Sequence, residues 1–480
     1  MTRRPVRGGA KRRETDMRTH LLAVLIAFTF IATTHAADRP PNIIIIFVDD
    51  MGYGDLGCYG HPTIRTPHLD QMAREGLRFT DFYSAASVCT PSRAALMTAR
   101  YAPRIGMASD KRRVLFPNSK GGLPHEEITI AEVLKERGYA THCIGKWHLG
   151  HLPQFLPTEH GFDSYYGIPY SNDMDRDGSK GPKNRDAFWE PKSEYWNVPL
   201  IRDKKEIERP ADQTTITKRY AEEAVKRIKE NKDKPFFIYL AHSLPHVPLF
   251  TSKEFEGKSL RGLYGDVIEE IDWTVGEVIK AVRENGLEKN TIVWFTSDNG
   301  PWLIFDDHGG SAGLLFEGKG CSWEGGQRVP GIVWGPGHIP GGRVTSELAS
   351  TLDFLPTSAA LAGAKIPADR KLDGYDLSAF ITGKADKSPR DRFFYYRDVS
   401  IYAVRDRTHK IHFTTKSAYG RDAAVKHDPP LLFDMNVDPS EKWNVAAKHT
   451  DVVDRLKRLA EEQNKGLEPV PSQLENENVK

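Results

Sequence analysis

The stretch "NIIIIFVDD", residues 42–50, decides the fold of this 480-residue chain. Four consecutive isoleucines, followed by phenylalanine and valine, leave the segment no polar face, so it is predicted to be a strand buried on both sides. Strands of this kind belong to parallel sheets that helices cover on both faces. Asp49 and Asp50 end the run, at the edge where such sheets bind their ligands.

Similar apolar runs recur along the chain, with amphipathic segments between them. Further strands are predicted at "ATHCIGK" (140–146), "PFFIYLAH" (235–242), "TIVWFTSDNG" (291–300) and "PGIVWGP" (330–336). Helices are predicted at 68–76, 129–138, 217–233 and 264–286. The first two of these end at Gly76 and Gly138, which suit a left-handed C-terminal cap. Strands that alternate with helices indicate an α/β fold with a large, mostly parallel sheet.

The last hundred residues have a different pattern. The pieces "RFFYYR", "SIYAVRD" and "HKIHFTT" predict a small antiparallel sheet. A helix is predicted near 449–465, and the polar tail "PSQLENENVK" is expected to be loose. The predicted domains are a main domain over 37–380, expected to be the catalytic one, and a C-terminal subdomain over 381–480.

The first 36 residues are predicted to be a signal peptide. Basic side chains precede the apolar run "LLAVLIAFTFIA" (21–32), and small residues follow it up to a cleavage site near Ala36. The run is short for a membrane span, so no stable span is expected, with a membrane anchor as the alternative. Met1 and Met17 are both possible starts. We expect export to the periplasm or secretion.

Charge and cysteine content exclude two classes of protein. Outside residues 1–36 the chain carries 60 basic and 63 acidic side chains, so no nucleic-acid partner is expected. Its cysteines, Cys58, Cys89, Cys143 and Cys321, are too few for a disulfide-held scaffold. If Cys89 has another role, at most one bridge can form among the other three.

Oxygen ligands follow two of the predicted strands. Asp49 and Asp50 follow the first, and Asp298 and Asn299 end the run at 291–300. Each pair alone is more often a helix cap or a turn. Together they put three carboxylates at one sheet edge, and like charges held so close need a counter-ion. An all-oxygen ligand set favours calcium over magnesium.

Cationic residues follow other predicted strands. Lys146 and His148 lie in "GKWHLG", His242 and His246 in "AHSLPHVPL", and Lys319 in "FEGKGCSWEGG". Each could be a surface charge or a structural histidine. Together with a metal site they favour a pocket for a tetrahedral oxyanion ester, in which lysines hold oxygens and a histidine protonates the leaving oxygen.

Two long motifs resemble signatures of the sulfatase family. "CTPSRAALMTAR" (89–100) is similar to C-x-P-S-R-x-x-L-x-T-G, and "GYATHCIGKWHLG" (138–150) is similar to the second sulfatase signature. "GIPYSND", "GKGCSWEGGQRVPGIVWGPGHIPGG" and "LLFDMNVDPSEKWNVA" resemble the arylsulfatase A and N-acetylgalactosamine-6-sulfatase branch. The resemblance covers roughly residues 40 to 450.

The resemblance implies a fold, a reaction and a modified residue. The fold would be an alkaline-phosphatase-like sandwich. The reaction would be calcium-dependent hydrolysis of a sulfate monoester, on a sulfated glycan or an aryl sulfate. Cys89 would be oxidised to formylglycine by a formylglycine-generating or anaerobic sulfatase-maturating enzyme, and the aldehyde hydrate would be the nucleophile. Calcium would be bound by Asp49, Asp50, Asp298, Asn299 and an oxygen of modified Cys89.

Further roles carry over by motif. Arg93 and Lys146 would hold the hydrate and the sulfate, and His148 would take a proton from the second hydroxyl as sulfate leaves. Lys319 and His246 would lie beside the bridging oxygen, with His246 as the acid for the leaving alcohol. Ser171, in "GIPYSND", matches a serine near the sulfate.

One departure and two alternatives remain. The signature glycine is Ala99 here, in a stretch that the maturation enzyme reads on the unfolded chain; conversion of Cys89 is still expected, because the core of the motif is intact. The alternatives are a phosphomonoester or phosphonate monoester hydrolase on the same fold, and a catalytically dead glycan-binding protein. The polar, aromatic segment 171–206 is predicted to be a loop at the pocket rim.

Overall fold

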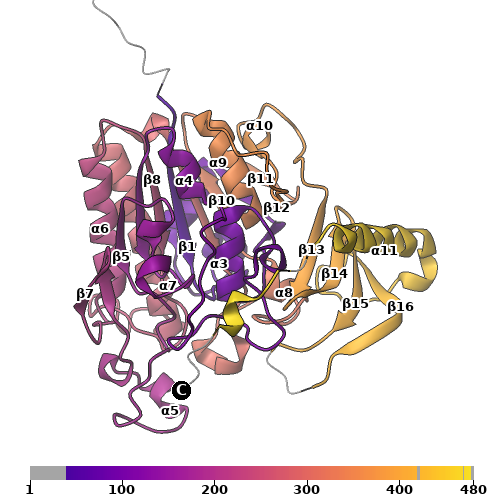
Figure 1. The fold of residues 1–480 in the computed structure, drawn as a ribbon, viewed down its shortest axis with the longest axis horizontal. Coiled ribbons are helices and arrows are strands. Elements are labelled where there is room, and N and C mark those ends of the chain that lie inside the picture. Colours follow the sequence, from indigo (N-terminus) through magenta and orange to yellow (C-terminus); the bar gives the residue numbers. More distant parts are fainter. Residues whose placement is uncertain (1–38, 419–421, 469, 477–480) are drawn as a thin grey trace, which may run out of the picture. The chain divides into compact units, whose positions relative to one another are not determined.

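The strand predicted from residues 42–50 lies in the middle of the main sheet (Figure 1). In the computed structural model of the chain it is β1 (Asn42–Val48), and all of its residues are buried. It pairs in parallel with β8 (Phe236–Ala241) on one side and β9 (Thr291–Ser297) on the other. The unbroken apolar run is therefore explained by neighbours on both edges and helices on both faces.

The structure describes residues 39–418, 422–468 and 470–476. The predicted signal peptide, residues 1–36, lies outside them. From Pro40 onward the described chain forms one compact unit. No helix within the described ranges is long and apolar enough to cross a membrane.

Within the described residues, the main sheet has ten strands in the order β11–β2–β10–β9–β1–β8–β4–β5–β6–β7. The central strands from β9 to β5 are all parallel, and antiparallel pairs lie toward both edges. This confirms the predicted α/β fold. The other strands of this sheet are β2 (Leu77–Phe79), β4 (Ala140–Gly145), β5 (Ser164–Gly167), β6 (Leu200–Arg202), β7 (Lys205–Glu208), β10 (Gly331–Trp334) and β11 (Arg343–Thr345); β3 (Phe82–Tyr83) and β12 (Ala349–Ser350) form a separate pair.

Strand β10 runs against its neighbour β9, although the sequence predicted it as one more run of the same kind in a mostly parallel sheet. Gly331 pairs with Thr296, so β10 begins at the edge where β9 ends. The segment between the two strands stays at that edge and makes no crossover to the other end of the sheet. Without a crossover the next strand can only run back antiparallel.

Helices cover both faces of the main sheet. Ile43 and Ile45 of β1 pack in one core with α3, α4 and α9, whereas Ile44 and Ile46 pack in the other with α2, α6 and α7. The helices are α2 (Pro67–Glu75), α3 (Cys89–Thr98), α4 (Ile130–Lys135), α5 (Asp186–Trp189), α6 (Ile216–Glu230), α7 (Leu263–Glu284), α8 (Glu324–Gln327), α9 (Phe354–Ala362), α10 (Ser378–Ile381) and α11 (Thr450–Lys465). All four helices predicted between the strands are present, and α4 is shorter than expected.

The two glycines predicted as left-handed caps differ. Gly138 has a φ of +77°, but it lies beyond the end of α4 at Lys135. Gly76 directly follows α2 with a φ of −129°, so the left-handed cap predicted there is wrong. Packing requires Gly76 instead, because a Cβ atom would lie 2.1 Å from the carbonyl oxygen of Val333.

The C-terminal sheet is antiparallel, as predicted. Its strands are β13 (Arg392–Arg397), β14 (Ser400–Asp406), β15 (His409–Thr415) and β16 (Val425–Asp434). Helix α11 packs on β14 and β15 and covers one face. Tyr83, Tyr101 and Leu352 of the main domain share an apolar core with this sheet.

Two segments predicted to be irregular are partly ordered. The rim segment 171–206 ends in strand β6 and the start of β7. In the tail, Leu474 is fully buried, and the amide of Gln473 donates to the carbonyl of Gly106 at 2.8 Å. The expectation of a loose tail is therefore wrong up to residue 476, because one apolar side chain among the polar ones fixes the segment.

Candidate active site

Cys89 is the first residue of α3 and lies under the carboxyl edge of the main sheet. Its side chain is only 2% exposed. The thiol donates to Oδ1 of Asp49 at 3.3 Å, and Nζ of Lys319 lies 3.5 Å from the sulfur. The cysteine predicted to be a nucleophile thus faces a carboxylate and an ammonium group that are distant in the sequence.

The four predicted oxygen ligands meet at the ends of two paired strands. Val48 pairs with Ser297, so the residues that follow β1 and β9 emerge side by side. Nδ2 of Asn299 donates to Oδ1 of Asp50 at 2.7 Å, and the amide of Asp50 donates to Asp298 at 3.2 Å. Oδ1 of Asn299 is buried and has no hydrogen-bond partner.

Burial acts on the pKa of all three carboxylates, and the charges around them shift it further in different directions. Burial raises the pKa of Asp50 to about 6, despite the nearby Lys319. Burial and the charge of Asp49 raise the pKa of Asp298 to about 7. Burial would also raise the pKa of Asp49, but Lys146, then His246 and Arg93, hold it well below its usual range. Burial therefore keeps the pKa of Asp50 and Asp298 raised even though Lys319 and Arg93 contact them.

Arg93 and Lys146 bind two of these carboxylates, Asp298 and Asp49. Arg93 lies one turn along α3 from Cys89; its Nε and one terminal nitrogen donate to Asp298 at 3.1 and 2.9 Å. The other terminal nitrogen donates to the carbonyl of Lys146 at 3.1 Å. The ammonium of Lys146 donates to Asp49 and, at 3.1 Å, to the hydroxyl of Ser171.

Lys319 reaches the site from the glycine-rich segment between β9 and β10. Its Nζ lies 2.6 Å from Oδ1 of Asp50 and 4.3 Å from the ring centroid of Trp302. The ring of Trp302 lies 5.1 Å from that of His246. Sequence reasoning missed Trp302, although its place three residues after Asn299 is a signal that could have identified it.

Two predicted histidines lie in the site in defined tautomers. Nδ1 of His246 contacts the carbonyl of Val247 at 2.6 Å, and since a carbonyl only accepts, Nδ1 carries the proton. Nε2 of His246 therefore faces Asp50 at 3.6 Å and Ser171 at 3.3 Å. His148 binds the carbonyl of Leu115 through Nε2 at 2.9 Å. Its Nδ1 is buried without a partner.

His242 does not join them. Its ring packs near Tyr220 at 6.3 Å, and neither ring nitrogen has a hydrogen-bond partner. Burial lowers the pKa of His242 to about 3, so it stays neutral. The grouping of His242 with the pocket cations is not supported, because its ring belongs to the α6 side of the sheet.

The thiol of Cys89 is not activated by its surroundings. Burial, then Asp298 and Asp49, raise the pKa of Cys89 well above its ordinary value, and the two lysines do not offset this. Burial also lowers the pKa of His148 and His246 well below the ordinary value, so neither is an imidazolium that could stabilise a thiolate. The cysteine as translated is therefore a poor nucleophile.

Other cysteines and cavities lie outside this cluster. None of Cys58, Cys89, Cys143 and Cys321 forms a disulfide.

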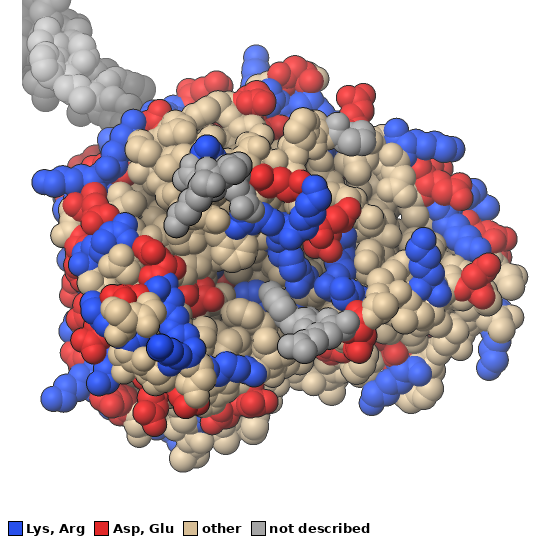
Figure 2. All heavy atoms as spheres, turned by 60° about the horizontal axis from the view of Figure 1, so that its bottom comes forward, with Lys and Arg blue, Asp and Glu red and all other residues tan. Residues whose placement is uncertain are grey.

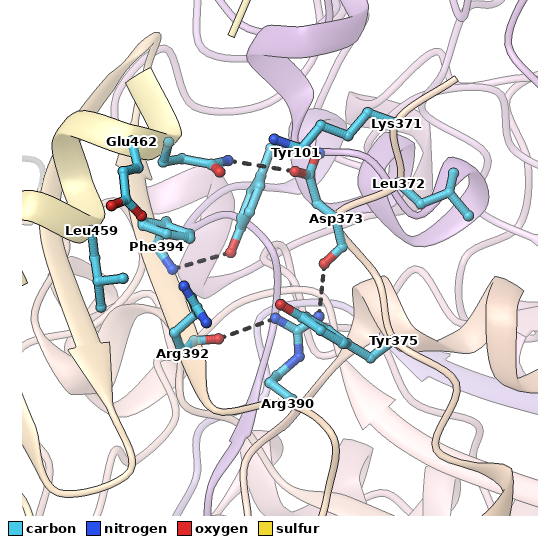
Figure 3. Close-up of a pocket in the computed structure, with 11 residues that line it drawn as sticks. Tyr101, Lys371, Leu372, Asp373, Tyr375, Arg390, Arg392, Phe394, Leu459 and Glu462 are labelled. Atoms are coloured by element: carbon cyan, nitrogen blue, oxygen red, sulfur yellow. Dashed lines mark hydrogen bonds between the residues drawn. The ribbon is translucent and has the colours of Figure 1, made fainter. Parts of the chain in front are cut away.

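A cavity of about 210 Å³ lies between α11 and the main domain (Figure 3), with Tyr101, Asp373 and Arg390 in its wall. None of the predicted site residues lines it. On the face shown in Figure 2 basic and acidic side chains are interspersed, whereas the charges of the site are buried.

Comparison with known proteins agrees with this geometry. Residues 41–364 match the family model described as Sulfatase, and residues 388–480 match the C-terminal region of aryl-sulfatase. The chain is 43% identical to arylsulfatase A of Homo sapiens, over 89% of each chain. It is 38% identical to N-acetylgalactosamine-6-sulfatase of Mus musculus, over 95% of this chain and 91% of that one.

A solved structure also matches the fold over most of its length. The structure of Ps i-CgsB in complex with k-i-k-neocarrahexaose has a TM-score of 0.77 and 32% sequence identity, and the match covers 92% of this chain and 96% of that one. Family model, relatives and fold all agree with the two signatures around Cys89 and Lys146. The chain therefore belongs to the sulfatase family and is a sulfuric ester hydrolase.

Proposed function

We propose that the protein hydrolyses the sulfate monoester of a glycan, with calcium as its metal and formylglycine at position 89 as its nucleophile. The observation that carries the proposal is the state of Cys89, a buried thiol with a raised pKa at the centre of three carboxylates and three cations. Such a thiol is chemically idle, whereas the groups around it suit an oxygen nucleophile and an anionic ester.

The residues present fit a hard divalent cation. Ligand atoms of Asp49, Asp50, Cys89 and His246 lie within 4.8 Å of one another, and the buried Oδ1 of Asn299 has no partner. An ion held by the carboxylates and this amide would satisfy that oxygen. It would also offset the negative charge that raises the pKa of Asp298. Oxygen donors in an irregular arrangement favour calcium over magnesium.

When bound, calcium would supply positive charge for the sulfate oxygens, and formylglycine would supply a hydrated aldehyde. The chain's own residues orient the ester. Lys146 and Ser171 are joined by a hydrogen bond, and Lys146 also contacts Asp49, the carboxylate that accepts from Cys89. Lys319 places its ammonium 3.5 Å from the sulfur. A tetrahedral anion bound at residue 89 would thus be held by these donors.

The tautomers suggest how protons are handled. Nδ1 of His148 is the free nitrogen of a neutral ring, so it can accept a proton from a hydroxyl at residue 89. Nε2 of His246 faces Ser171 and Asp50, beside Lys319, and is placed to exchange a proton with the leaving oxygen. Two different histidines would thus serve nucleophile activation and protonation of the alcohol.

A glycan is the substrate class we favour. Among the relatives, one is named for a sulfated N-acetylgalactosamine and one was solved with a neocarrahexaose. Trp302 belongs to an aromatic cluster in which the rings of Phe188, Trp189 and Trp302 each lie within 5.5 Å of the buried ring of Phe305, and the first three are only partly buried. Aromatic faces suit the apolar side of a sugar ring, and they also suit an aryl sulfate.

The test combines mass analysis with turnover. The protein is made with and without a maturation enzyme, and the peptide that contains Cys89 is analysed by mass spectrometry. We expect the aldehyde only in the first preparation, together with turnover of sulfated mono- and polysaccharides above that of aryl sulfate and far above that of aryl phosphate. Turnover by a preparation that retains the thiol would contradict the proposed nucleophile.

Metal dependence is tested on the same preparation. Removal of bound ions with a calcium-selective chelator should abolish turnover, and calcium should restore it better than magnesium at equal concentration. The melting temperature gives a second readout, since an ion that binds only the folded state raises it. Full activity in the ion-free protein would contradict the metal assignment.

A further inference from the structure

We propose that Arg397 of the C-terminal sheet, together with Arg113, positions Lys319 for the reaction. Both guanidinium groups donate to the carbonyl oxygen of Gly320, the residue directly after Lys319. The distance from the terminal nitrogen of Arg113 is 2.9 Å. Arg397 is a positioning residue in this proposal, because it touches the segment that carries Lys319 and not the reacting atoms.

The two arginines come from separate parts of the chain. Arg397 is the last residue of β13, and Arg113 lies in the loop that follows the α3 region. The Nε atom of each arginine lies 3.8 Å from a carboxylate oxygen of Asp398. We call Arg113, Arg397 and Asp398 the arginine clamp. It joins the main domain and the C-terminal sheet at one backbone oxygen next to the site.

The segment needs such a contact because its backbone is intrinsically free. Lys319 lies between Gly318 and Gly320, and Gly320 has a φ of +92°. Glycine on both sides leaves a chain with many accessible conformations. The amides of Lys319 and Gly320 donate to Pro301 and Ser87, both at 2.8 Å. The arginine clamp binds the carbonyl oxygen of Gly320 in the same stretch. Both the amides and the carbonyl next to Lys319 are therefore held by hydrogen bonds.

The clamp is electrostatically unfavourable by itself. Burial and the charge of Arg113 lower the pKa of Arg397, and Asp398 only partly offsets them. Arg397 is buried and Arg113 is partly exposed. Hydrophobic groups of similar size often replace buried charges without loss of stability. A buried arginine beside Lys319 is explained if the precise direction of the Gly320 carbonyl matters for the reaction.

The inference rests on the proposed function, in which Lys319 lies by the bridging oxygen. If Lys319 stabilises charge on the leaving oxygen, its placement matters most for esters of weakly acidic alcohols. Loss of the clamp should therefore slow poor leaving groups strongly and good ones weakly. A misplacement of about 1 Å can lower a rate by about 100-fold.

The experiment is a double-mutant cycle on the formylglycine-bearing enzyme. R397M, K319A and the double variant are assayed on a series of aryl sulfates whose phenols span a range of acidity. For R397M we expect kcat to fall about 10- to 100-fold with the least acidic phenol and less than about threefold with nitrophenol, with KM nearly unchanged. In the K319A background R397M should have little further effect. R397K should recover part of the rate.

A matched control removes an equivalent contact elsewhere. Arg343 donates to the carbonyls of Ile381 and Phe380 at 3.0 and 3.3 Å, far along the chain from the clamp. R343M should leave kcat unchanged for every leaving group. Melting temperatures of all variants identify those that lose folded protein.

The possible failures are distinguishable. An R397M effect of equal size with and without Lys319, or equal for all phenols, overturns the positioning role. If K319A itself leaves kcat unchanged with poor leaving groups, the proposed role of Lys319 fails, and the inference fails with it.

Discussion

Two clusters of buried charged side chains differ in how fully hydrogen bonds and opposite charges compensate their carboxylates. The first is the proposed active site around Cys89. The second, here called the Glu324 cluster, lies between the main domain and the C-terminal sheet and consists of Glu324, Arg328, Arg405, Lys410 and Glu441. Glu324, Arg405 and Lys410 are as completely buried as Asp49 and Asp298.

In the Glu324 cluster the carboxylate is fully engaged. One oxygen of Glu324 accepts from Tyr395 at 2.5 Å and Lys410 at 2.9 Å, and the other accepts from Tyr83 at 2.7 Å and Arg328 at 3.3 Å. Burial would raise the pKa of Glu324, but Lys410 and the arginines lower it well below its usual range.

In the proposed active site the pKa shifts of two carboxylates run the other way. The pKa values of Asp50 and Asp298 are raised, and buried atoms of Asn299 and His148 have no partner. Burial and charge therefore do not distinguish a site from a structural network. The direction of the carboxylate pKa shifts does separate these two clusters, since it is upward for Asp50 and Asp298 and downward for Glu324.

The largest expected effect separates activity from stability at the site. C89A should lower kcat/KM at least about 10³-fold, because no nucleophile remains at position 89. Its free energy of unfolding should change by only about 1 kcal/mol, since one small side chain is shortened. Steady-state assays and urea unfolding measure the two quantities. Residual activity of more than a few per cent would place the nucleophile elsewhere.

The Glu324 cluster should respond in the reverse way. K410M leaves Glu324 and Glu441 buried without their shared cation, and we expect a loss of about 3–5 kcal/mol in the free energy of unfolding. The double variant K410M/E324Q should lose less than the sum of its single variants. Urea unfolding of all three checks this, with kcat of the folded fraction expected within tenfold of the parent enzyme. Strict additivity would show that the pair is not coupled.

Acid should weaken the Glu324 cluster in a predictable direction. Because the folded-state pKa of Glu324 is lowered, the unfolded chain takes up the proton first. Its stabilisation is fully present above about pH 4.5, the ordinary pKa of a glutamate, and is lost as the pH falls toward the folded-state value. E324Q should be less stable at pH 7 and should lose less stability between about pH 5 and pH 3. An unchanged slope in that window would contradict the assignment.

The smallest expected effect concerns the helix that presents Cys89. Ala99 caps α3 with a φ of +57°, in the left-handed region that favours glycine, at the position where the sulfatase signature has glycine. A99G should raise the free energy of unfolding by about 0.5–1 kcal/mol. Turnover of the modified enzyme should not change. A lowered kcat would show that strain in this cap belongs to the mechanism.

The sequence allowed the central features to be predicted, since they depend on local pattern. The isoleucine run identified the buried strand, and the rule that parallel strands end at one edge brought Asp49 and Asp298 together. The two signatures selected Cys89 and Lys146. These residues do lie in one cluster, with Lys146 bonded to Asp49.

Features that depend on tertiary contact could not be predicted. The direction of β10 depends on the path of the segment before it, and Gly76 is required by a carbonyl on β10. No periodicity encodes the conformation after Asn299 that brings Trp302 to the site, and only its place three residues after Asn299 indicates it. The contact of Arg397 with Gly320 joins residues 77 positions apart.

The order in which these residues are synthesised has a consequence. The proposed nucleophile, the proposed oxygen ligands and Lys319 all precede position 320, whereas Arg397 and the tail residue Gln473, which binds Gly106, are made last. A chain is synthesised from its N-terminus, so these proposed reactive groups are made before the Arg397 contact can form. A fragment that ends before β13 would hold the proposed reactive groups and lack that contact.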